Sequence, residues 1–331
     1  MTITLSKPPQ HNAATLNPSS KHLLDVDSLS SDQIQGLIEN AREFRDLRSS
    51  RPYKSDILRG ISIYTLFFED STRTRVSFEH AGKGLGADVI NITAATSSVN
   101  KGESLLNTAL TLDSMGVDAL IIRHPHSGAP HFVARQVNAT VINAGDGAHA
   151  HPTQALLDVM TLEAAIGNLQ DAKLAIIGDI LYSRVARSDI IAFRKMGAEI
   201  SIAAPSTLLP QGWVPGTNSL NIPGTHVTVH ESVEDAIRDA DAIICLRLQL
   251  ERQSAGLLPD INEYSRVWGL NAQRLSVAKP DAPVMHPGPM NEGVEISTDV
   301  AHGTRSLVTN QVQNGVAMRM AVLEHFCAAI G

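Results

Sequence analysis

The chain is 331 residues long, which is more than one hydrophobic core usually spans, so the length predicts two domains. Apolar residues make up 43% of it and charged residues 18%, which excludes the composition of a disordered or fibrous protein. The formal net charge of −7 excludes the surplus of Lys and Arg that marks proteins binding nucleic acids or anionic membranes.

The first predicted element is a helix that follows a polar tail. Residues 1–20 are rich in Ser, Pro, Asn and His, so we expect a loose segment there. Ser30 and Gln33 then form a capping box, the pattern that begins a helix. Apolar residues recur with helical spacing from Ile34 to Phe44 and give this helix one buried face.

Beyond this helix, apolar β-prone runs alternate with amphipathic stretches. The predicted strands are 61–68, 87–92, 118–122, 139–142, 173–177, 199–203, 226–230, 242–246 and 283–286. Continuously apolar strands that alternate with helices indicate parallel sheets covered on both faces. The predicted fold class is therefore α/β, with two domains, each a mostly parallel sheet flanked by helices, joined by long interdomain helices.

The helical pattern that begins near His151 and runs to Ile166 is the predicted connection between the domains. We expect the first domain to comprise residues 21–152 together with a C-terminal helix at 305–331, and the second to comprise 153–304. Residues 205–224, rich in Pro and Gly, and residues 249–260 predict surface loops.

The cysteine count and the hydropathy pattern bear on the compartment. Cys245 and Cys327 lie far apart without CxxC spacing, so neither a disulfide framework nor a zinc site is predicted. No stretch reaches the ~18 apolar residues of a membrane span, and the N-terminus has no signal-peptide pattern. We therefore expect a soluble protein of the reducing cytoplasm.

The segment Ser71-Thr72-Arg73-Thr74-Arg75 lies between a predicted strand and a predicted helix. The first turn of a helix favours anions, because its backbone N–H groups and its dipole point outward there. Arginine adds a planar fork that suits phosphate oxygens. A simpler interpretation makes Ser71 an N-cap and the arginines a solvated face. Three hydroxyls interleaved with two arginines favour a site for the phosphate end of a small acyl phosphate.

Other motifs follow this segment at a distance. They are Ser97-Ser98-Val99-Asn100-Lys101-Gly102-Glu103, Arg123-His124-Pro125, His151-Pro152-Thr153-Gln154-Ala155-Leu156-Leu157-Asp158, Gly178-Asp179 through Arg184, Arg247-Leu248-Gln249 and His286-Pro287-Gly288-Pro289. In type and order these motifs closely resemble those of the aspartate and ornithine carbamoyltransferases, and the resemblance extends over most of the chain.

The resemblance implies where carbamoyl phosphate binds. The implied binding residues are Ser71, Thr72, Arg73, Thr74, Arg123, His151, Gln154, Gly288 and Pro289, of which Arg73, Thr74, Arg123 and His151 are implied as catalytic. These residue types suit the chemistry, because negative charge grows on the carbonyl oxygen when an amine attacks, and fixed donors stabilise it. Gln154 can accept a hydrogen bond from the carbamoyl NH2 group, and so can the carbonyls of Pro287 or Gly288 if the Gly288–Pro289 bond is cis.

Several of these residues also have a plainer explanation. A His-Pro pair such as His151-Pro152 often marks only the start of a helix, but Gln154 lies one turn later on the same face and the remaining motifs are present. Arg184 alone fits a helix-start surface residue. Arg247, Gln249 and Lys101 each fit a loop residue when taken alone.

The second substrate distinguishes the two branches of the family. Aspartate brings two carboxylates, and Lys101, Arg184, Arg247 and Gln249 supply donors for both. The ornithine branch typically carries His-Cys-Leu-Pro where this chain has His286-Pro287-Gly288-Pro289. We therefore expect the aspartate branch, which condenses carbamoyl phosphate with L-aspartate to N-carbamoyl-L-aspartate and phosphate, an early step of de novo pyrimidine (UMP) biosynthesis.

Two other functions stay open. One is transfer to another amine, such as ornithine or an acylated ornithine. The other is a catalytically silent scaffold, which the intact Arg73, Lys101 and His151 argue against.

The resemblance also implies partners. In the family, the residues equivalent to Ser97 and Lys101 reach into the site of the neighbouring subunit, which implies a homotrimer, alone or in a larger assembly with regulatory chains or dihydroorotase. We expect no cofactor, because no GxGxxG follows the strand before Gly178. We also expect no metal, because the histidine pairs His124/His126 and His149/His151 fit no zinc template. At Glu292 many relatives carry arginine instead.

Overall fold

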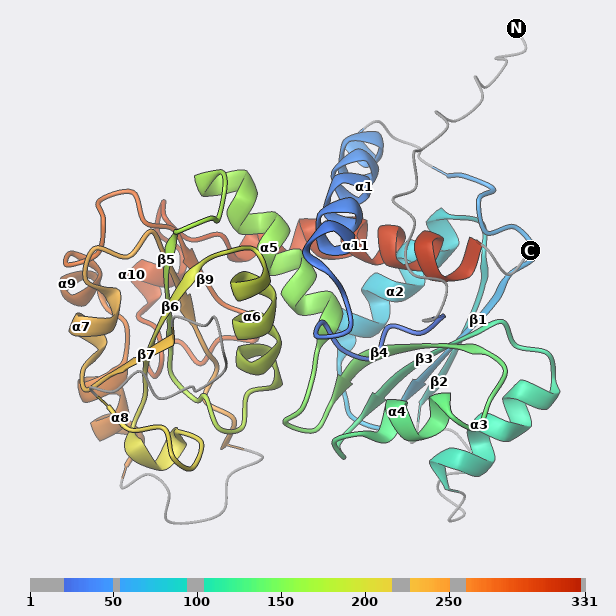
Figure 1. Cartoon of the computed structure of the whole chain (residues 1–331), viewed down its shortest axis with the longest axis horizontal. Helices are drawn as coiled ribbons and strands as arrows, with labels where there is room; N and C mark the ends of the chain where they lie inside the picture. Colours follow the sequence, from blue (N-terminus) through green and yellow to red (C-terminus); the bar gives the residue numbers. More distant parts are fainter. Residues whose placement is uncertain (1–20, 50–53, 94–103, 216–226, 251–259, 329–331) are drawn as a thin grey trace, which may run out of the picture.

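The computed structural model describes residues 21–49, 54–93, 104–215, 227–250 and 260–328. Figure 1 shows two halves, each built around one sheet, with the long helix α5 (Pro152–Ile166) running from one half to the other. The fold class predicted from the sequence is confirmed: both sheets are parallel, and helices flank them.

The first sheet has the strand order β2-β1-β3-β4. Its strands are β1 (Ser62–Phe67), β2 (Asp88–Thr93), β3 (Ala119–His124) and β4 (Thr140–Asp146). Its helices are α1 (Ser31–Ser49), α2 (Thr72–Gly84), α3 (Leu105–Ser114) and α4 (Ala129–Ala134). Strand β3 shows how the two faces are covered: Leu120 and Ile122 pack with residues of α3 and α4, whereas Ile121 packs with residues of α1.

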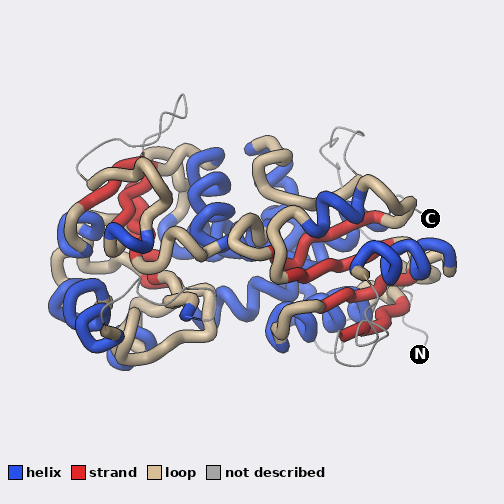
Figure 2. The backbone as a smooth tube through the Cα atoms, turned by 90° about the horizontal axis from the view of Figure 1, so that it is seen from below, coloured by secondary structure: helices blue, strands red, loops and turns tan. Residues whose placement is uncertain are grey.

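The second sheet has the strand order β7-β6-β5-β8-β9. Its strands are β5 (Lys173–Ile177), β6 (Glu199–Ala203), β7 (Val227–His230), β8 (Ala242–Cys245) and β9 (Val284–Met285). Its helices are α6 (Arg184–Lys195), η3 (Ser206–Leu208), α7 (Val233–Ile237), α8 (Ile261–Trp268), α9 (Ala272–Leu275) and α10 (Thr298–Ala301). Figure 2 shows the strands of the two sheets as separate groups.

The last helix, α11 (Val308–Cys327), returns to the first half and packs against α1, α2 and α5. We therefore propose that it belongs to the first domain, as the sequence predicts. The predicted capping box also forms at the start of α1: the backbone N–H of Ser30 donates to Gln33 Oε1 at 2.7 Å, and that of Gln33 donates to Ser30 Oγ at 3.2 Å.

Every predicted strand is present, and most of the predicted strand ends are met to within one or two residues. Two element ends differ by more. Strand β4 continues to Asp146, beyond the predicted end at residue 142, because the polar side chain of Asn143 is buried and hydrogen bonded instead of facing solvent. Helix α2 begins at Thr72, earlier than the predicted start near Arg75, because Ser71 already caps it. Cys245 and Cys327 are free and buried. Among the described residues, no helix is long and apolar enough to cross a membrane.

Candidate active site

A cavity of about 740 Å³ lies where the carboxyl ends of the two sheets face each other. In open parallel sheets, ligands bind beyond the carboxyl ends of the strands, at the point where the strand order reverses. In the first sheet this point lies between β1 and β3, and in the second between β5 and β8. Arg123 of β3 and the segments that follow β1, β5 and β8 supply more than half of the residues that line the cavity. The topology therefore selects the same place that the motifs indicate.

The cavity brings together all of the predicted site residues that the structure describes. They are Ser71, Thr72, Arg73, Thr74, Arg123, His151, Gln154, Arg184, Arg247, Gln249, Gly288 and Pro289. Ser97 and Lys101, which the sequence analysis assigns to a neighbouring site, lie outside the described residues.

The turn from β1 into α2 carries the hydroxyl-rich segment. Ser71 Oγ accepts a hydrogen bond from the Thr74 backbone N–H at 3.3 Å, so Ser71 is an N-cap as well as a cavity residue. Thr74 is buried, and Arg73 donates from Nη1 to the Pro287 carbonyl at 2.9 Å. Burial lowers the pKa of Arg73 from its ordinary value. The turn thus places a guanidinium, hydroxyls and a helix N-terminus beside one another.

Gly288 lies against this turn from the other half of the molecule. Its φ of +61° is in the left-handed region, and a side chain there would collide with the guanidinium of Arg73. The Gly288–Pro289 peptide bond, which the sequence analysis considered only as a condition, is cis. Because the Pro287 carbonyl already accepts from Arg73, this segment fixes Arg73 in addition to lining the cavity.

Glu69 is a cavity residue that the sequence analysis missed. Its Oε1 accepts from Arg123 Nη2 at 2.8 Å and from Arg184 Nη2 at 2.7 Å, and its Oε2 accepts from Arg184 Nη1 at 2.9 Å. The carboxylate therefore occupies the fork of Arg184 and joins the two sheets. Arg184 is only 4% exposed, which rules out the helix-start surface residue considered from the sequence. A carboxylate two residues before Ser71 was the available signal.

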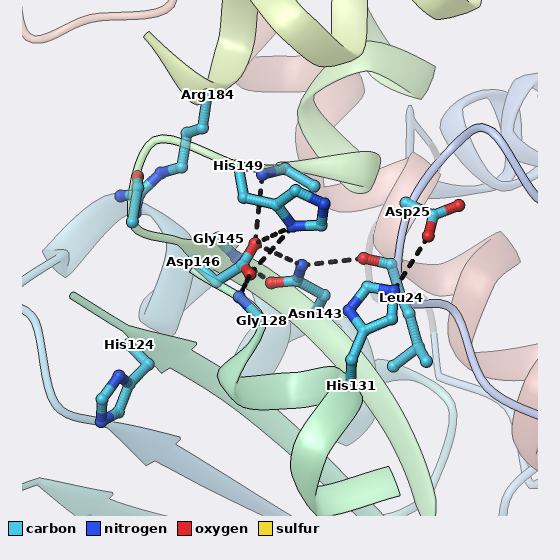
Figure 3. A network of polar contacts seen from close by, with 12 residues as sticks. Leu24, Asp25, His124, Gly128, His131, Asn143, Gly145, Asp146, His149 and Arg184 are labelled. Carbon is cyan, nitrogen blue, oxygen red and sulfur yellow. Dashed lines mark hydrogen bonds and ion pairs between the residues drawn. The ribbon is translucent and has the colours of Figure 1, made fainter. Parts of the chain in front are cut away.

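The loop after β4 supports the same two arginines. Arg123 Nη1 donates to the Ala144 carbonyl and Arg184 Nη1 to the Gly147 carbonyl, both at 3.3 Å. Gly145 has a φ of +116°, and a Cβ atom added to it would lie 2.9 Å from Arg184 Nε and 3.3 Å from Arg123 Nη1. Figure 3 shows the Arg184 side chain reaching this loop. Glycine at position 145 therefore lets both guanidiniums approach the backbone.

Asp146 holds this loop in shape. Its carboxylate accepts from the backbone N–H groups of Gly128 at 2.6 Å and Ala150 at 3.1 Å, from Asn143 Nδ2 at 2.8 Å, and from His149 Nδ1 at 3.0 Å (Figure 3). His149 gains a partner, and this hydrogen bond raises its pKa. The network fixes the path of the chain into His151.

The same residues include a group that invites a metal interpretation. One ligand atom each from His131, Asp146 and His149 lies within 4.8 Å of the others. Both oxygens of Asp146 already accept N–H donors, so we assign this group to loop support rather than to a metal site. That the protein needs neither metal nor cofactor stays a prediction.

His151 and Gln154 begin helix α5, with Pro152 at its first position. The backbone N–H of His151 donates to Ser188 Oγ at 2.9 Å, which anchors the start of α5 to α6. Both side chains are buried against the cavity, and Gln154 donates from Nε2 to Asp158. His151 and Gln154 thus line the same cavity as the turn that carries Thr74 and Arg73.

Arg247 and Gln249 follow strand β8 and enter the cavity from the second sheet. Asp179, which follows β5, fixes their segment: its Oδ2 accepts from the Gln249 backbone N–H at 3.1 Å, and its Oδ1 accepts from that of Tyr182 at 3.0 Å. The Gly178-Asp179 motif therefore ties together the ends of two adjacent strands, which explains a motif that the sequence did not connect to a role.

The C-terminal helix adds residues that sequence reasoning also missed. Gln311, Val312, Gly315, Val316 and Arg319 of α11 line the cavity. Arg319 is buried, donates to the Gly315 carbonyl at 2.8 Å and lies 5.1 Å from the centre of the Phe78 ring. Burial lowers its pKa to about 10. A lone arginine within an otherwise apolar stretch of helix was the signal for it. Glu292, by contrast, is outside the cavity and contacts His302 at 3.0 Å.

Two models of one protein family match this chain. The carbamoyl-phosphate-binding domain of aspartate/ornithine carbamoyltransferases matches residues 21–164, and the aspartate/ornithine-binding domain matches residues 170–326. The chain belongs to the aspartate/ornithine carbamoyltransferase family.

Individual carbamoyltransferases agree with this assignment. The chain is 51% identical over 303 residues to the aspartate carbamoyltransferase catalytic subunit of Desulforudis audaxviator, an alignment that covers 92% of this chain and 96% of that protein. It is 50% identical over 308 residues to the catalytic subunit of Ruminiclostridium cellulolyticum, with coverage of 93% and 96%.

Solved carbamoyltransferase structures share the fold. The aspartate transcarbamoylase of Trypanosoma cruzi in complex with carbamoyl phosphate superposes with a TM-score of 0.80 at 32% identity, covering 92% of this chain and 96% of that one. The ornithine carbamoyltransferase of Pyrococcus furiosus has a TM-score of 0.81 at 28% identity, with coverage of 93% and 97%. The fold alone therefore does not separate the aspartate branch from the ornithine branch.

Proposed function

We propose that this protein is an aspartate carbamoyltransferase, which transfers the carbamoyl group of carbamoyl phosphate to the α-amino group of L-aspartate. One observation carries the proposal: the hydroxyl- and arginine-rich turn of the first sheet and Arg184 and Arg247 of the second sheet open onto one cavity. Catalytic subunits that are about half identical over nine tenths of the chain bear the aspartate carbamoyltransferase name.

In this proposal the phosphate of carbamoyl phosphate binds at Ser71, Thr72, Arg73 and Thr74. The geometry supports it, because the N-terminus of α2, the hydroxyls and the guanidinium of Arg73 meet there. The carbamoyl group then lies toward Arg123, His151 and Gln154, with Gly288 and Pro289 on the opposite side. Arg184, Arg247 and Gln249 are left to hold the carboxylates of aspartate, and Glu69 limits the excess of positive charge between them.

The chemistry needs no nucleophile from the protein. The amine nitrogen forms a bond to the carbonyl carbon, the bond between that carbon and the bridging phosphate oxygen breaks, and the departing phosphate takes a proton from the amine. Thr74, Arg123 and His151 serve as fixed donors to the carbonyl oxygen while it bears negative charge. The rate then comes mainly from holding two anions side by side in a buried site.

We further propose that the protein acts as a homotrimer in the cytoplasm. Among the described residues no lysine lines the cavity, whereas the resemblance to the family implies one, which Lys101 of a neighbouring subunit would supply. Equilibrium sedimentation of the purified protein tests this proposal, and a monomer at assay concentrations would overturn it. Adding candidate regulatory chains or dihydroorotase in the same measurement tests the larger assembly.

A ureido assay with different amines tests the proposed reaction. Carbamoyl phosphate is supplied with L-aspartate, L-ornithine or N-acetyl-L-ornithine, and we expect product only with aspartate. Preferential turnover of ornithine would move the protein to the other branch of its family. No turnover with any amine, from a folded trimer, would favour the scaffold function.

A further inference from the structure

Asp158 lies on α5 one turn after Gln154 and is completely buried. Two amide side chains converge on its carboxylate. Gln154 Nε2 donates to both oxygens at 3.1 Å, and Gln311 Nε2 of helix α11 donates to Oδ1 at 2.6 Å. Asp158 itself does not line the cavity, whereas Gln154 and Gln311 do.

A backbone group determines which way the Gln311 amide points. The His286 backbone N–H, which can only donate, donates to Gln311 Oε1 at 3.0 Å. The NH2 group of Gln311 must therefore face Asp158. The oxygen and nitrogen of an amide are assigned from such partners, and here the partner admits one orientation.

The carboxylate of Asp158 determines in turn how the Gln154 amide is oriented. An ionised carboxylate accepts hydrogen bonds and donates none, so Gln154 must turn its NH2 group toward Asp158. Its other amide atom, Oε1, then faces the cavity that Gln154 lines. In the described part of the chain, no donor reaches this oxygen.

We propose that Asp158 and Gln311 are positioning residues that lock the Gln154 amide with its oxygen toward the cavity, so that the site selects an acyl phosphate bearing an NH2 group. This inference rests on the proposed function and extends it. An NH2 group on the bound acyl carbon donates to Oε1, whereas the methyl group of acetyl phosphate leaves the same oxygen without a partner. Leaving a buried polar atom unpaired costs about 1–3 kcal/mol, which makes the site selective.

The burial of Asp158 is costly, which argues against a role in stability alone. Burial raises its pKa to about 7, against the opposing effect of its amide partners and of Arg319. Asp189 of α6, also completely buried and without a hydrogen-bond partner among the described residues, has its pKa raised by burial and by the nearby Asp158. A neutral side chain at position 158 would be easier to bury.

The variant Asp158→Asn separates orientation from packing, because it keeps the size of the side chain. Its Oδ1 continues to accept from Gln311, so its Nδ2 faces Gln154. The Gln154 amide then turns over, so that its NH2 group replaces Oε1 at the cavity. The NH2 group of carbamoyl phosphate then meets the NH2 group of Gln154, and neither can accept a hydrogen bond from the other. Asp189→Asn is the matched control, since it changes the other buried aspartate and touches neither amide.

Two kinetic constants are measured at pH 8, where Asp158 is ionised: the KM of carbamoyl phosphate at saturating aspartate, and the Ki of acetyl phosphate as a competitor. For Asp158→Asn we expect the KM to rise roughly tenfold or more while the Ki stays within about twofold. Asp189→Asn should leave both constants unchanged. In the Gln154→Ala background, Asp158→Asn should add no further effect on the KM, because Asp158 acts through Gln154.

An unchanged KM in Asp158→Asn, an equal rise in KM and Ki, or an additive effect in the Gln154→Ala background would each overturn the inference. A wild-type protein that does not turn over carbamoyl phosphate would instead overturn the proposed function. We expect Asp158→Asn to melt no lower than the wild type at pH 8, whereas a purely structural role predicts a lower Tm.

A test on the wild-type protein does not depend on the folding of any variant. Protonated Asp158 can donate to Gln154 Oε1, so the ratio of KM to Ki should rise as the pH falls through about 7. Arg319 and Asp189 are the charged or titratable groups whose fields act on Asp158, and neither changes which amide atom it contacts. The phosphate groups of carbamoyl phosphate and acetyl phosphate titrate alike, so the effect of their titration on binding cancels in the ratio of KM to Ki. The same pH dependence in Gln154→Ala would contradict the inference.

Discussion

At the residue scale, the cavity depends on pairs of groups that hold each other in place. Glu69 holds Arg123 and Arg184, Asp179 holds the backbone N–H of Gln249, and Asp158 holds the Gln154 side chain. The supporting residues are mostly acidic or amide side chains next to the cationic ones. Such support keeps donors at fixed positions, which is the condition for stabilising charge without rearrangement during the reaction.

Replacing Glu69 by glutamine tests this support. Glu69→Gln keeps the size of the side chain but removes the charge that three guanidinium contacts share, so Arg123 and Arg184 lose their common anchor. We expect kcat/KM to fall roughly 10- to 100-fold, the range for hydrogen bonds to charged groups. Steady-state kinetics measure it. Glu79→Gln, on the same stretch of chain but paired with Lys83, should leave kcat/KM near the wild-type value.

Replacing Gly145 by alanine tests the close approach of the arginines to the loop. The new Cβ atom would lie 2.9 Å from Arg184 Nε, in a residue with positive φ, so both arginines must shift. We expect a large loss of kcat/KM together with about 1–2 kcal/mol of destabilisation, measured by kinetics and urea unfolding. Gly128→Ala is the control, because its φ is +83° but no atom lies within 4 Å of the added Cβ. Equal kinetic losses in both variants would show that backbone strain, not crowding, is responsible.

At the scale of elements, the ends of helices determine where the chain turns into the cavity. Ser71 caps α2 and thereby sets the turn that carries Arg73, and Ser183 caps α6 just before Arg184. The capping box of α1 has a different consequence, since α1 packs on α11 and lies away from the cavity. Caps of the same chemical type thus contribute to function in two helices and to stability in a third.

The variant Ser30→Ala tests the capping box of α1. It removes the hydroxyl that accepts from the Gln33 N–H, so we expect a loss of about 1 kcal/mol in the free energy of unfolding with unchanged kinetic constants. Urea unfolding and the ureido assay measure the two quantities. Gln33→Glu is the matched control, because glutamate completes the same box. A change in KM in Ser30→Ala would mean that α1 is coupled to the cavity.

At the scale of the whole molecule, the cavity belongs to both halves. Residues from the first sheet, from the second sheet and from α11 line it, and Glu69 bridges the sheets through Arg184. A ligand that fills this cavity therefore contacts both halves and stabilises the folded protein by linkage.

Carbamoyl phosphate should accordingly raise the Tm. At 100 times its Kd the expected stabilisation is about 2.7 kcal/mol, and the shift should be small in Arg73→Ala, which loses the guanidinium at the phosphate end. Differential scanning fluorimetry measures the Tm shift in the wild type and in Arg73→Ala. Lys83→Ala, at the far end of α2, should keep the full shift. A full shift in Arg73→Ala would place the phosphate elsewhere in the cavity.

Local patterns in the sequence determined much of this protein. Continuous apolar runs fixed the strands, because burial on both faces of a parallel sheet requires them, and the capping box at Ser30 fixed the start of α1. The motif residues from Ser71 to Pro289 indicated the cavity, because their chemistry matches an anionic substrate and their order matches a family. These signals lie within a few residues of each other, or in the order of motifs that is typical of the family.

Only the tertiary structure decided how residues support the motifs. Glu69 and Asp158 lie beside or within motifs, but their partners do not follow from the motifs. Gln311 carries no local pattern that separates it from ordinary polar residues, and it lies 153 positions from its partner Asp158. The order of strands in each sheet, which places the ends of β1, β3, β5 and β8 around one cavity, likewise follows from packing across the whole molecule. A contact between distant segments depends on how complete layers pack, and no local stretch of sequence contains that information.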